Sequence, residues 1–199
     1  MPHGAAYRTA GLIMAGFTDN ARAAIDEIGR VFDRMSDGGV TPALEAIAGA
    51  RRVICYAGGR EGLGLKFFVM RLMHLGKDAH WAWDDTAPAC GKGDVFIASC
   101  GSGGYNHIFY TAQKAKERGA TFIAVTASPD SEFAKLADIV VFLPAAAYLA
   151  KGDLVPTKQP MGNLYEQSAV IMYDMMVMAL KDMMGVTYEE MEARHRNYE

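Results

Sequence analysis

Short apolar runs that alternate with helical segments restrict the fold of this 199-residue chain more than any other feature. The runs occupy residues 53–57, 79–83, 95–100, 122–127 and 139–143. None of them alternates polar and apolar residues throughout, so most are expected to be strands covered on both faces, as in a parallel sheet. Helical segments lie between them, over 62–75, 106–118 and 131–137. This alternation predicts right-handed crossover connections and a three-layer α/β/α sandwich with a five-stranded parallel sheet.

Helices are also expected on either side of the strand region. Residues 21–35 carry apolar side chains on one helical stripe, and a short helix over 41–49 has proline in its first turn. A methionine-rich helix over 164–184 follows a long loop at 145–160, and a polar tail covers 186–199. We expect a single domain over 1–199, with N-terminal helices to about residue 50, a sheet core over 51–145, and a C-terminal helix and tail over 160–199.

The composition is that of a globular chain, with 51% hydrophobic and 22% charged residues. A net charge of −3 without any Lys/Arg run argues against nucleic acid as a partner, since a phosphate backbone requires a concentrated basic surface. No run of about 18 apolar residues is present, so no membrane span is expected. The opening residues, 1–17, lack the pattern of a signal peptide. The three cysteines lack C-x-x-C spacing, and the two within apolar runs, Cys55 and Cys100, are expected to be buried thiols. These features predict a cytoplasmic protein.

Two glycine-rich segments follow predicted strands and open predicted helices: Ala57–Gly62 and Cys100–Asn106. Glycine at such a turn lets backbone N–H groups approach a ligand, and the helix N-terminus adds partial positive charge, which suits an anion or a sugar oxygen. Tight turns also need glycine for structural reasons, but two such loops at the carboxyl ends of parallel strands indicate a ligand crevice. Neither segment matches a dinucleotide fingerprint or a P-loop, so a nucleotide site is the weaker interpretation.

A series of motifs then occurs in order along the chain. They are Gly-Gly-Arg-x-Gly at 58–62, Arg-Leu-Met-His-Leu-Gly at 71–76, Gly-Ser-Gly at 101–103, Pro-Met-Gly-x-Leu-Tyr-Glu at 160–166, and Arg-His-x-Asn at 194–197. This series resembles the sugar isomerase (SIS) domain family over roughly residues 20–197, and within it the 6-phospho-3-hexuloisomerases. The resemblance implies a five-stranded parallel sheet, a small sugar phosphate as substrate, and a tetramer with active sites at subunit interfaces.

Two positions depart from the pattern of that family. The first loop of the family reads Gly-Arg-Ser-Gly, and its serine helps to hold the substrate phosphate, whereas this chain has Glu61. Tyr105 stands where the second loop usually has Thr or Ser, so only Ser102 remains of three expected hydroxyls. Glu61 is either a first-turn helix acid that points to solvent or a contact to a substrate whose terminal group is not a conventional phosphate. The expected substrate-binding residues are Gly59, Arg60, Glu61, Gly101, Ser102, Gly103 and Tyr105.

Sugar isomerisation requires a base that removes a proton alpha to a carbonyl, so that an enediol forms, and it needs no cofactor. Glu166 is the candidate base, and the resemblance assigns the proton-transfer role to the glutamate of this motif. The alternative is an N-terminal helix acid that stabilises the helix dipole. The resemblance also makes His74 and His195 catalytic partners that assist ring opening or proton transfer, across a subunit boundary. No trio of His or acidic residues has the spacing of metal ligands, so no metal is expected.

The sequence leaves more than one class of function open. We expect an isomerase, acting on a sugar phosphate or on a non-phosphorylated or sulfonated sugar. The alternative is a non-catalytic, sugar-phosphate-binding regulatory protein. The apolar C-terminal helix and the amphipathic N-terminal helix present more apolar surface than one sheet face requires, which predicts a homo-oligomer, a dimer or a tetramer.

Overall fold

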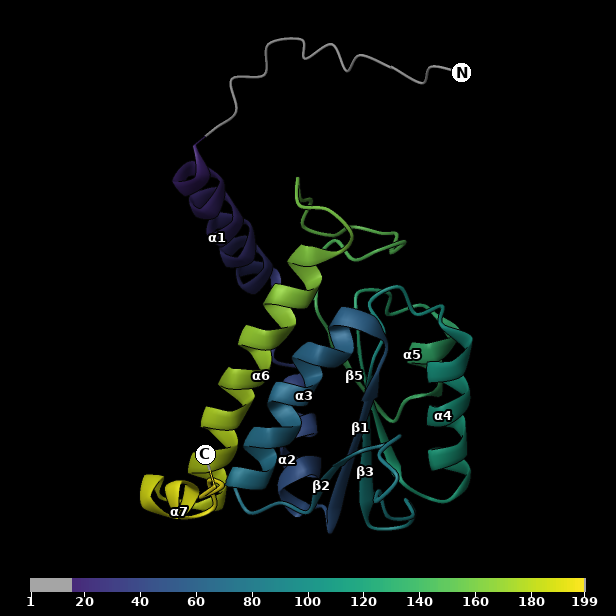
Figure 1. The fold of residues 1–199 in the computed structure, drawn as a ribbon. Helices are drawn as coiled ribbons and strands as arrows, with labels where there is room; N and C mark the ends of the chain where they lie inside the picture. The colour runs from purple at the N-terminus through teal and green to yellow at the C-terminus, as the bar shows by residue number, and fades with distance from the viewer. Residues whose placement is uncertain (1–15, 199) are drawn as a thin grey trace, which may run out of the picture.

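The computed structural model describes residues 16–198 and has a five-stranded sheet at its centre (Figure 1). The strands are β1 (Arg52–Ala57), β2 (Ala79–Trp81), β3 (Asp94–Ser99), β4 (Thr121–Thr126) and β5 (Ile139–Phe142). All neighbouring pairs are parallel, in the order β2-β1-β3-β4-β5. The chain therefore moves outward from β1 to β2 and returns to the other side of β1 at β3. The predicted parallel sheet is confirmed.

The described residues form seven helices. They are α1 (Phe17–Arg34), α2 (Val40–Gly49), α3 (Gly59–His74), α4 (Asn106–Glu117), α5 (Glu132–Leu136), α6 (Asn163–Met184) and α7 (Tyr188–Ala193). Successive strand residues point to opposite faces: Val53 and Cys55 join the core under α2, α3 and α6, whereas Ile54 and Tyr56 join the core under α4 and α5. Figure 1 shows these two helical layers on opposite sides of the strands, so the three-layer sandwich is confirmed.

Several boundaries differ from those expected from the sequence. Helix α3 begins at Gly59 rather than at residue 62, because Gly59 has a φ of +54° and turns the chain directly into the helix. The polar tail contains α7, whose start is fixed by reciprocal hydrogen bonds between Thr187 and Glu190. Of the predicted buried thiols, Cys55 and Cys100 are indeed buried. The expectation that the opening residues lack a signal peptide falls mostly on residues 1–15, which lie outside the described residues.

Helix α1 is tied to the rest of the chain by a buried carboxylate. Glu27 accepts hydrogen bonds from the Thr157 hydroxyl at 2.5 Å, the Gln159 side-chain amide at 3.0 Å and the Lys158 backbone N–H at 3.3 Å. Burial by itself would raise the pKa of Glu27, but these hydrogen bonds outweigh it, and the pKa lies below the ordinary value of 4.5. The carboxylate thus anchors the loop that precedes α6.

Replacing Glu27 with Gln is expected to destabilise the fold by roughly 1–3 kcal/mol. The side-chain NH₂ group of Gln would stand where a carboxylate oxygen now accepts a hydrogen bond, and it can only donate. A lowered folded-state pKa gives stability that is present above the unfolded pKa and lost as the pH falls through the folded value. The wild type should therefore lose this contribution below about pH 4.5, and the variant should not. Urea unfolding at pH 7 and pH 4 measures both effects. Glu45→Gln, on the exposed side of α2, is the matched control, and an equal loss there would contradict the assignment.

The described residues include no helix that is both long enough and apolar enough to cross a bilayer.

Candidate functional site

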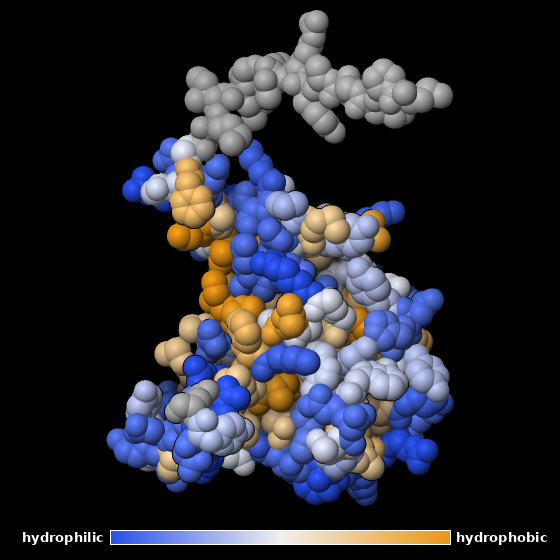
Figure 2. All heavy atoms as spheres, viewed as in Figure 1, coloured by the Kyte–Doolittle hydropathy of each residue, from blue (hydrophilic) through white to orange (hydrophobic). Residues whose placement is uncertain are grey.

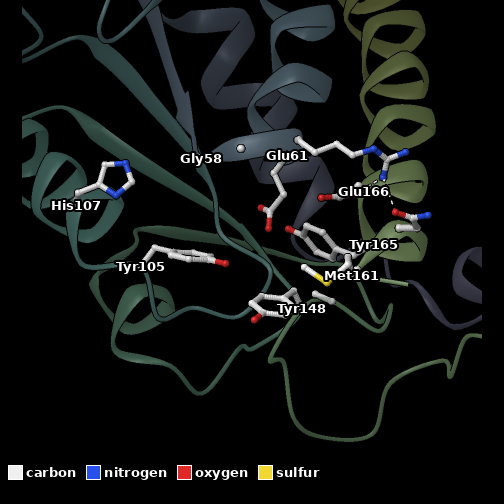
Figure 3. A pocket seen from close by; sticks show the side chains of 13 residues that line it. Gly58, Glu61, Tyr105, His107, Tyr148, Met161, Tyr165 and Glu166 are labelled. Atoms are coloured by element: carbon white, nitrogen blue, oxygen red, sulfur yellow. Dashed lines mark hydrogen bonds and ion pairs between the residues drawn. The ribbon is translucent and has the colours of Figure 1, made fainter. Parts of the chain in front are cut away.

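The carboxyl ends of β1 and β3 lie side by side at the point where the strand order reverses, which is where open parallel sheets bind ligands. Both glycine loops leave the sheet here, and the start of α6 closes the third side. A cavity of about 470 Å³ lies between them, and we name it the front cavity (Figure 3). Its walls comprise Gly58, Gly59, Arg60, Glu61, Tyr105, His107, Ala147, Tyr148, Met161, Gly162, Asn163, Tyr165 and Glu166.

Glu166 enters the front cavity from the first turn of α6. Its carboxylate forms an ion pair with Arg60, which lies on the first turn of α3, and its side chain is only 15% exposed. Arg60 also donates to Asn163 Oδ1 at 3.0 Å, so the guanidinium links the starts of the two helices. This pair orients the Glu166 carboxylate and balances its charge. The N-cap residue of α6 is Gly162, in a left-handed conformation, so no side chain caps this helix.

Glu61 points inward, so the interpretation of this residue as a solvent-facing helix acid is wrong. Its carboxylate accepts a hydrogen bond from Ser99 Oγ at 3.0 Å and from the Gly101 backbone N–H at 3.2 Å. These donors belong to the end of β3 and the second glycine loop, which pairing of β1 with β3 brings next to α3. Figure 3 shows the carboxylate directed into the front cavity. The Glu61 carboxylate therefore accepts hydrogen bonds from the end of β3 and from the second glycine loop, and does not face solvent.

The surroundings of Glu61 change its acidity. Burial raises its pKa to about 7, against the opposing effect of the hydrogen bonds from Ser99 and Gly101, and the negative charge of Glu166 adds to the rise. The front cavity thus holds two carboxyl groups in unequal environments. One is paired with a cation, and the other contacts neutral donors.

The second glycine loop packs closely against its neighbours at this cavity. A Cβ on Gly101 would lie 2.7 Å from Ala147 Cβ and 3.2 Å from the Tyr165 ring, so only glycine fits. Ser102 and Gly103, like Gly101, are not part of the cavity wall, and Ser102 Oγ accepts from the Gly104 N–H at 3.4 Å. Tyr105 does line the cavity, and it is 41% exposed.

Several residues of the cavity wall were not predicted from the sequence as site residues. Tyr165 is fully buried, and its hydroxyl lies 3.1 Å from Ser99 Oγ, which extends the chain of hydrogen bonds to Glu61. Tyr148 comes from the long loop after β5, which the sequence shows only as an ordered connection. Met161 and Tyr165 belong to the same motif as Glu166, and that was the signal available for them.

His74 and His195 lie together, but not in the front cavity. Their rings stack with centroids 5.4 Å apart, and both line a second cavity of about 670 Å³, which we name the rear cavity. Burial lowers the pKa of His74, and the positive charges of Arg71, His195 and Arg196 lower it further. Arg71 Nη1 lies 3.1 Å from His74 Nδ1, and since a guanidinium only donates, Nδ1 accepts and the neutral ring carries its proton on Nε2.

The two cavities lie at opposite ends of the same two helices. Glu61 and Glu166 are on the first turns of α3 and α6, whereas His74 and Lys181 are near their last turns. At 1.5 Å per residue the separation is about 20 Å along α3 and about 22 Å along α6. One chain therefore brings the predicted base together with Arg60 and Glu61, but not with the two predicted histidines. No group of three His, Cys, Asp or Glu side chains within residues 16–198 is arranged to hold a metal ion.

A comparison with protein families shows where the chain belongs. The model of the SIS domain matches residues 46–152, which contain all five strands and both glycine loops. The chain belongs to the SIS domain family. The match of this SIS domain ends before Glu166 and His195.

Two curated relatives extend the likeness of this SIS protein over most of its length. It is 35% identical over 182 residues to the 3-hexulose-6-phosphate isomerase of Mycobacterium gastri, covering 92% of this chain and 91% of the relative. It is 34% identical over 153 residues to the 3-hexulose-6-phosphate isomerase of Bacillus subtilis, covering 77% and 83%. A hypothetical protein from Methanococcus jannaschii has the same fold, with a TM-score of 0.78 and 23% identity over 91% of this chain and 99% of the other. Its structure was used to infer a function of 3-hexulose-6-phosphate isomerase for that protein.

Proposed function

We propose that this protein is a sugar-phosphate isomerase that moves a carbonyl group between neighbouring carbons of its substrate. The observation that carries the proposal is the Glu166 carboxylate, held by Arg60 at a cavity on the topological switch point of the sheet. A positioned carboxylate can remove the proton alpha to a carbonyl and return it to the adjacent carbon through an enediol. The names of the Mycobacterium gastri and Bacillus subtilis relatives support the same reaction class and point to 3-hexulose 6-phosphate as the first substrate to test.

One observation favours a second class of substrate for the same reaction. The Glu61 carboxylate accepts from the Gly101 N–H, and Glu61 and Tyr105 stand where the family has hydroxyls. A substrate phosphate on this loop would meet a carboxylate rather than donors, at least while Glu61 is ionised. A non-phosphorylated or sulfonated sugar is therefore the alternative substrate.

The function is tested with the protein in deuterium oxide, using 3-hexulose 6-phosphate and, in parallel, the corresponding free sugar. Conversion of the phosphate ester, with deuterium entering at the carbon next to the carbonyl, is the expected result. Conversion of the free sugar alone would select the second substrate class. Ligand-dependent thermal stabilisation without conversion of either compound would contradict the isomerase and favour a binding protein.

We further propose that the active site is shared between two copies of the chain. An exposed apolar stripe runs along α3 and α6 between the two cavities, and it comprises Leu63, Phe67 and Met70 on α3 with Ile171, Met175 and Met178 on α6. Figure 2 shows apolar side chains gathered on this face of the molecule. Both helices run from the front cavity to the rear cavity. A two-fold axis across the middle of the stripe would thus set each front cavity against the partner's rear cavity.

The charges of the two cavities fit this pairing. The front cavity carries Glu61 and Glu166 with a single arginine, whereas the rear cavity carries Arg71, Lys181 and Arg196 with Glu192 as its only acid. The rear cavity is therefore net positive, whereas the front cavity is neutral, or singly negative once Glu61 has lost its proton, so the pairing brings no like charges together. His74 and His195 would then reach the substrate from the other subunit.

Phe67→Glu combined with Met175→Glu is expected to convert the oligomer into monomers and to abolish turnover, because two charges would be buried in the stripe. Sedimentation velocity at micromolar concentration measures the oligomeric state. Tyr110→Glu, on exposed α4 in the opposite layer, is the control and should leave the assembly unchanged. A wild type that sediments as a monomer would overturn the shared site.

A further inference from the structure

Glu61 and Glu166 face the same cavity, but their partners differ in kind. Glu166 is paired with the Arg60 guanidinium, so its charge is balanced. Glu61 contacts only the Ser99 hydroxyl and the Gly101 amide, and among the described residues no cation lies within ion-pair distance of it. A carboxyl group in such a setting holds its proton more tightly than one beside an arginine.

Isomerisation of a hydroxy-ketone moves two protons. One leaves a carbon and arrives at the neighbouring carbon, which the proposed function assigns to Glu166. The other must reach the carbonyl oxygen and leave the neighbouring hydroxyl oxygen, because the carbonyl and hydroxyl exchange places. A second proton-transfer group within reach of the two oxygens is therefore required, or water must serve.

We propose that Glu61 is this second catalytic residue, the acid that protonates the substrate's carbonyl oxygen while Glu166 removes the carbon-bound proton. The inference rests on the proposed isomerase function. As the C–H electron pair forms the C=C bond of the enediol, the carbonyl oxygen takes the proton of Glu61. Ionised Glu61 then accepts the proton of the neighbouring hydroxyl as that oxygen becomes the new carbonyl. Glu166 returns its proton to the other carbon, so both carboxyl groups end as they began.

The hydrogen bonds of Glu61 leave Oε1 as the carboxyl oxygen available for this proton transfer. Oε2 is held by Ser99 Oγ at 3.0 Å and by the Gly101 N–H at 3.2 Å, whereas Oε1 shares only the Gly101 N–H, at 3.3 Å. The Ser99 hydroxyl is fixed in turn by the buried Tyr165 hydroxyl. In Figure 3 the carboxyl group of Glu61 points into the cavity between Tyr105 and Tyr165. A pKa raised by burial to about 7 allows the group to give and to take a proton near neutral pH.

Other titratable groups border Glu61, and their effect on the pH dependence of kcat/KM must be distinguished from that of Glu61. Glu166 and Tyr165 lie on α6, Tyr105 and Cys100 on the second loop, Tyr148 on the loop after β5, and His107 on α4, with Arg60 beside Glu61 on α3. Burial raises the pKa values of Tyr165, Tyr105 and Cys100, which moves their titration further from neutrality. His107 is the imidazole of this cavity and serves as the control.

The test compares the full-length wild type with Glu61→Gln on 3-hexulose 6-phosphate. Gln can still accept from the Gly101 N–H, so thermal unfolding should change little. We expect kcat to fall about 100- to 1,000-fold while KM stays within about threefold, the pattern of an interaction made only in the transition state. In the wild type kcat/KM should decline above about pH 7, as Glu61 loses its proton. That decline should be absent from Glu61→Gln and retained in His107→Gln.

Three results would overturn the assignment while leaving the isomerase function intact. The first is a Glu61→Gln kcat within about threefold of the wild type. The second is a gain of kcat/KM in Glu61→Ser/Tyr105→Thr, which would make Glu61 a selector against phosphate. The third concerns Glu61→Asp, which keeps a carboxyl group and takes the place of Glu61→Gln if that variant does not fold. Glu61→Asp should retain the decline of kcat/KM above about pH 7, and a profile without that decline would overturn the assignment. A folded wild type without turnover of any sugar or sugar phosphate would instead overturn the proposed function itself.

Discussion

Glu166→Gln is expected to lower kcat by about 1,000-fold or more, because an amide cannot accept the carbon-bound proton of the substrate. The neutral side chain still reaches Arg60 and Asn163, so the starts of α3 and α6 should stay in place. Binding of 3-hexulose 6-phosphate, measured by thermal shift, should therefore survive in the inactive variant. Exchange of the carbon-bound proton with deuterium oxide should disappear together with turnover.

The control for this substitution is Glu117→Gln, on the surface of α4, where the carboxylate pairs with Lys114. It should leave kcat within about twofold of the wild type, because exposed pairs contribute little. Near-normal turnover by Glu166→Gln would remove this residue from the mechanism and would leave Arg60 without a catalytic partner to orient.

Mixing two inactive variants should restore activity if the site is shared between subunits. Glu166→Gln removes the base of the front cavity, and His195→Ala removes a ring of the rear cavity. In a mixed dimer both defects fall in one of the two shared sites, and the other site is intact. Random exchange of subunits should therefore recover about one quarter of the wild-type activity.

Within one chain the two cavities lie about 20 Å apart along the helices, so the outcome of the mixing experiment is decisive in both directions. No recovery after verified subunit exchange would mean that Glu166 and His195 do not meet across an interface. Full activity of His195→Ala alone would remove the rear cavity from catalysis. A mixture of Glu166→Gln with Glu61→Gln should stay inactive, because both residues belong to the same front cavity and every shared site then carries one defect.

Much of the fold was predictable because its signals are local. Each apolar run reports a strand, and the central strands β1, β3 and β4 are buried on both faces. The stretch over 164–184 reports a helix through its composition alone. The glycine loops could be placed at one edge of the sheet because the carboxyl ends of parallel strands meet there. The helix α7 was missed although the Thr187 and Glu190 pair of its capping box is visible in the sequence.

The arrangement within the site was decided by contacts between distant segments. Arg60 and Glu166 are 106 residues apart, and only the packing of α3 beside α6 joins them. The position of Glu61 in the sequence is compatible both with a solvent-facing acid and with a buried one. Its direction is fixed by the Ser99 hydroxyl and the Gly101 amide, which β1–β3 pairing places under the first turn of α3.

The sequence by itself determined the layers, the sheet and the edge at which the candidate site lies, since these follow from the periodicity of apolar residues and from glycine. The tertiary structure decided which of the candidate residues meet. It gathered Arg60, Glu61 and Glu166 in one cavity and stacked His74 on His195 in another. The physical reason is that a buried carboxylate adopts the orientation in which it finds hydrogen-bond donors, and those donors come from strands and loops far away in the chain.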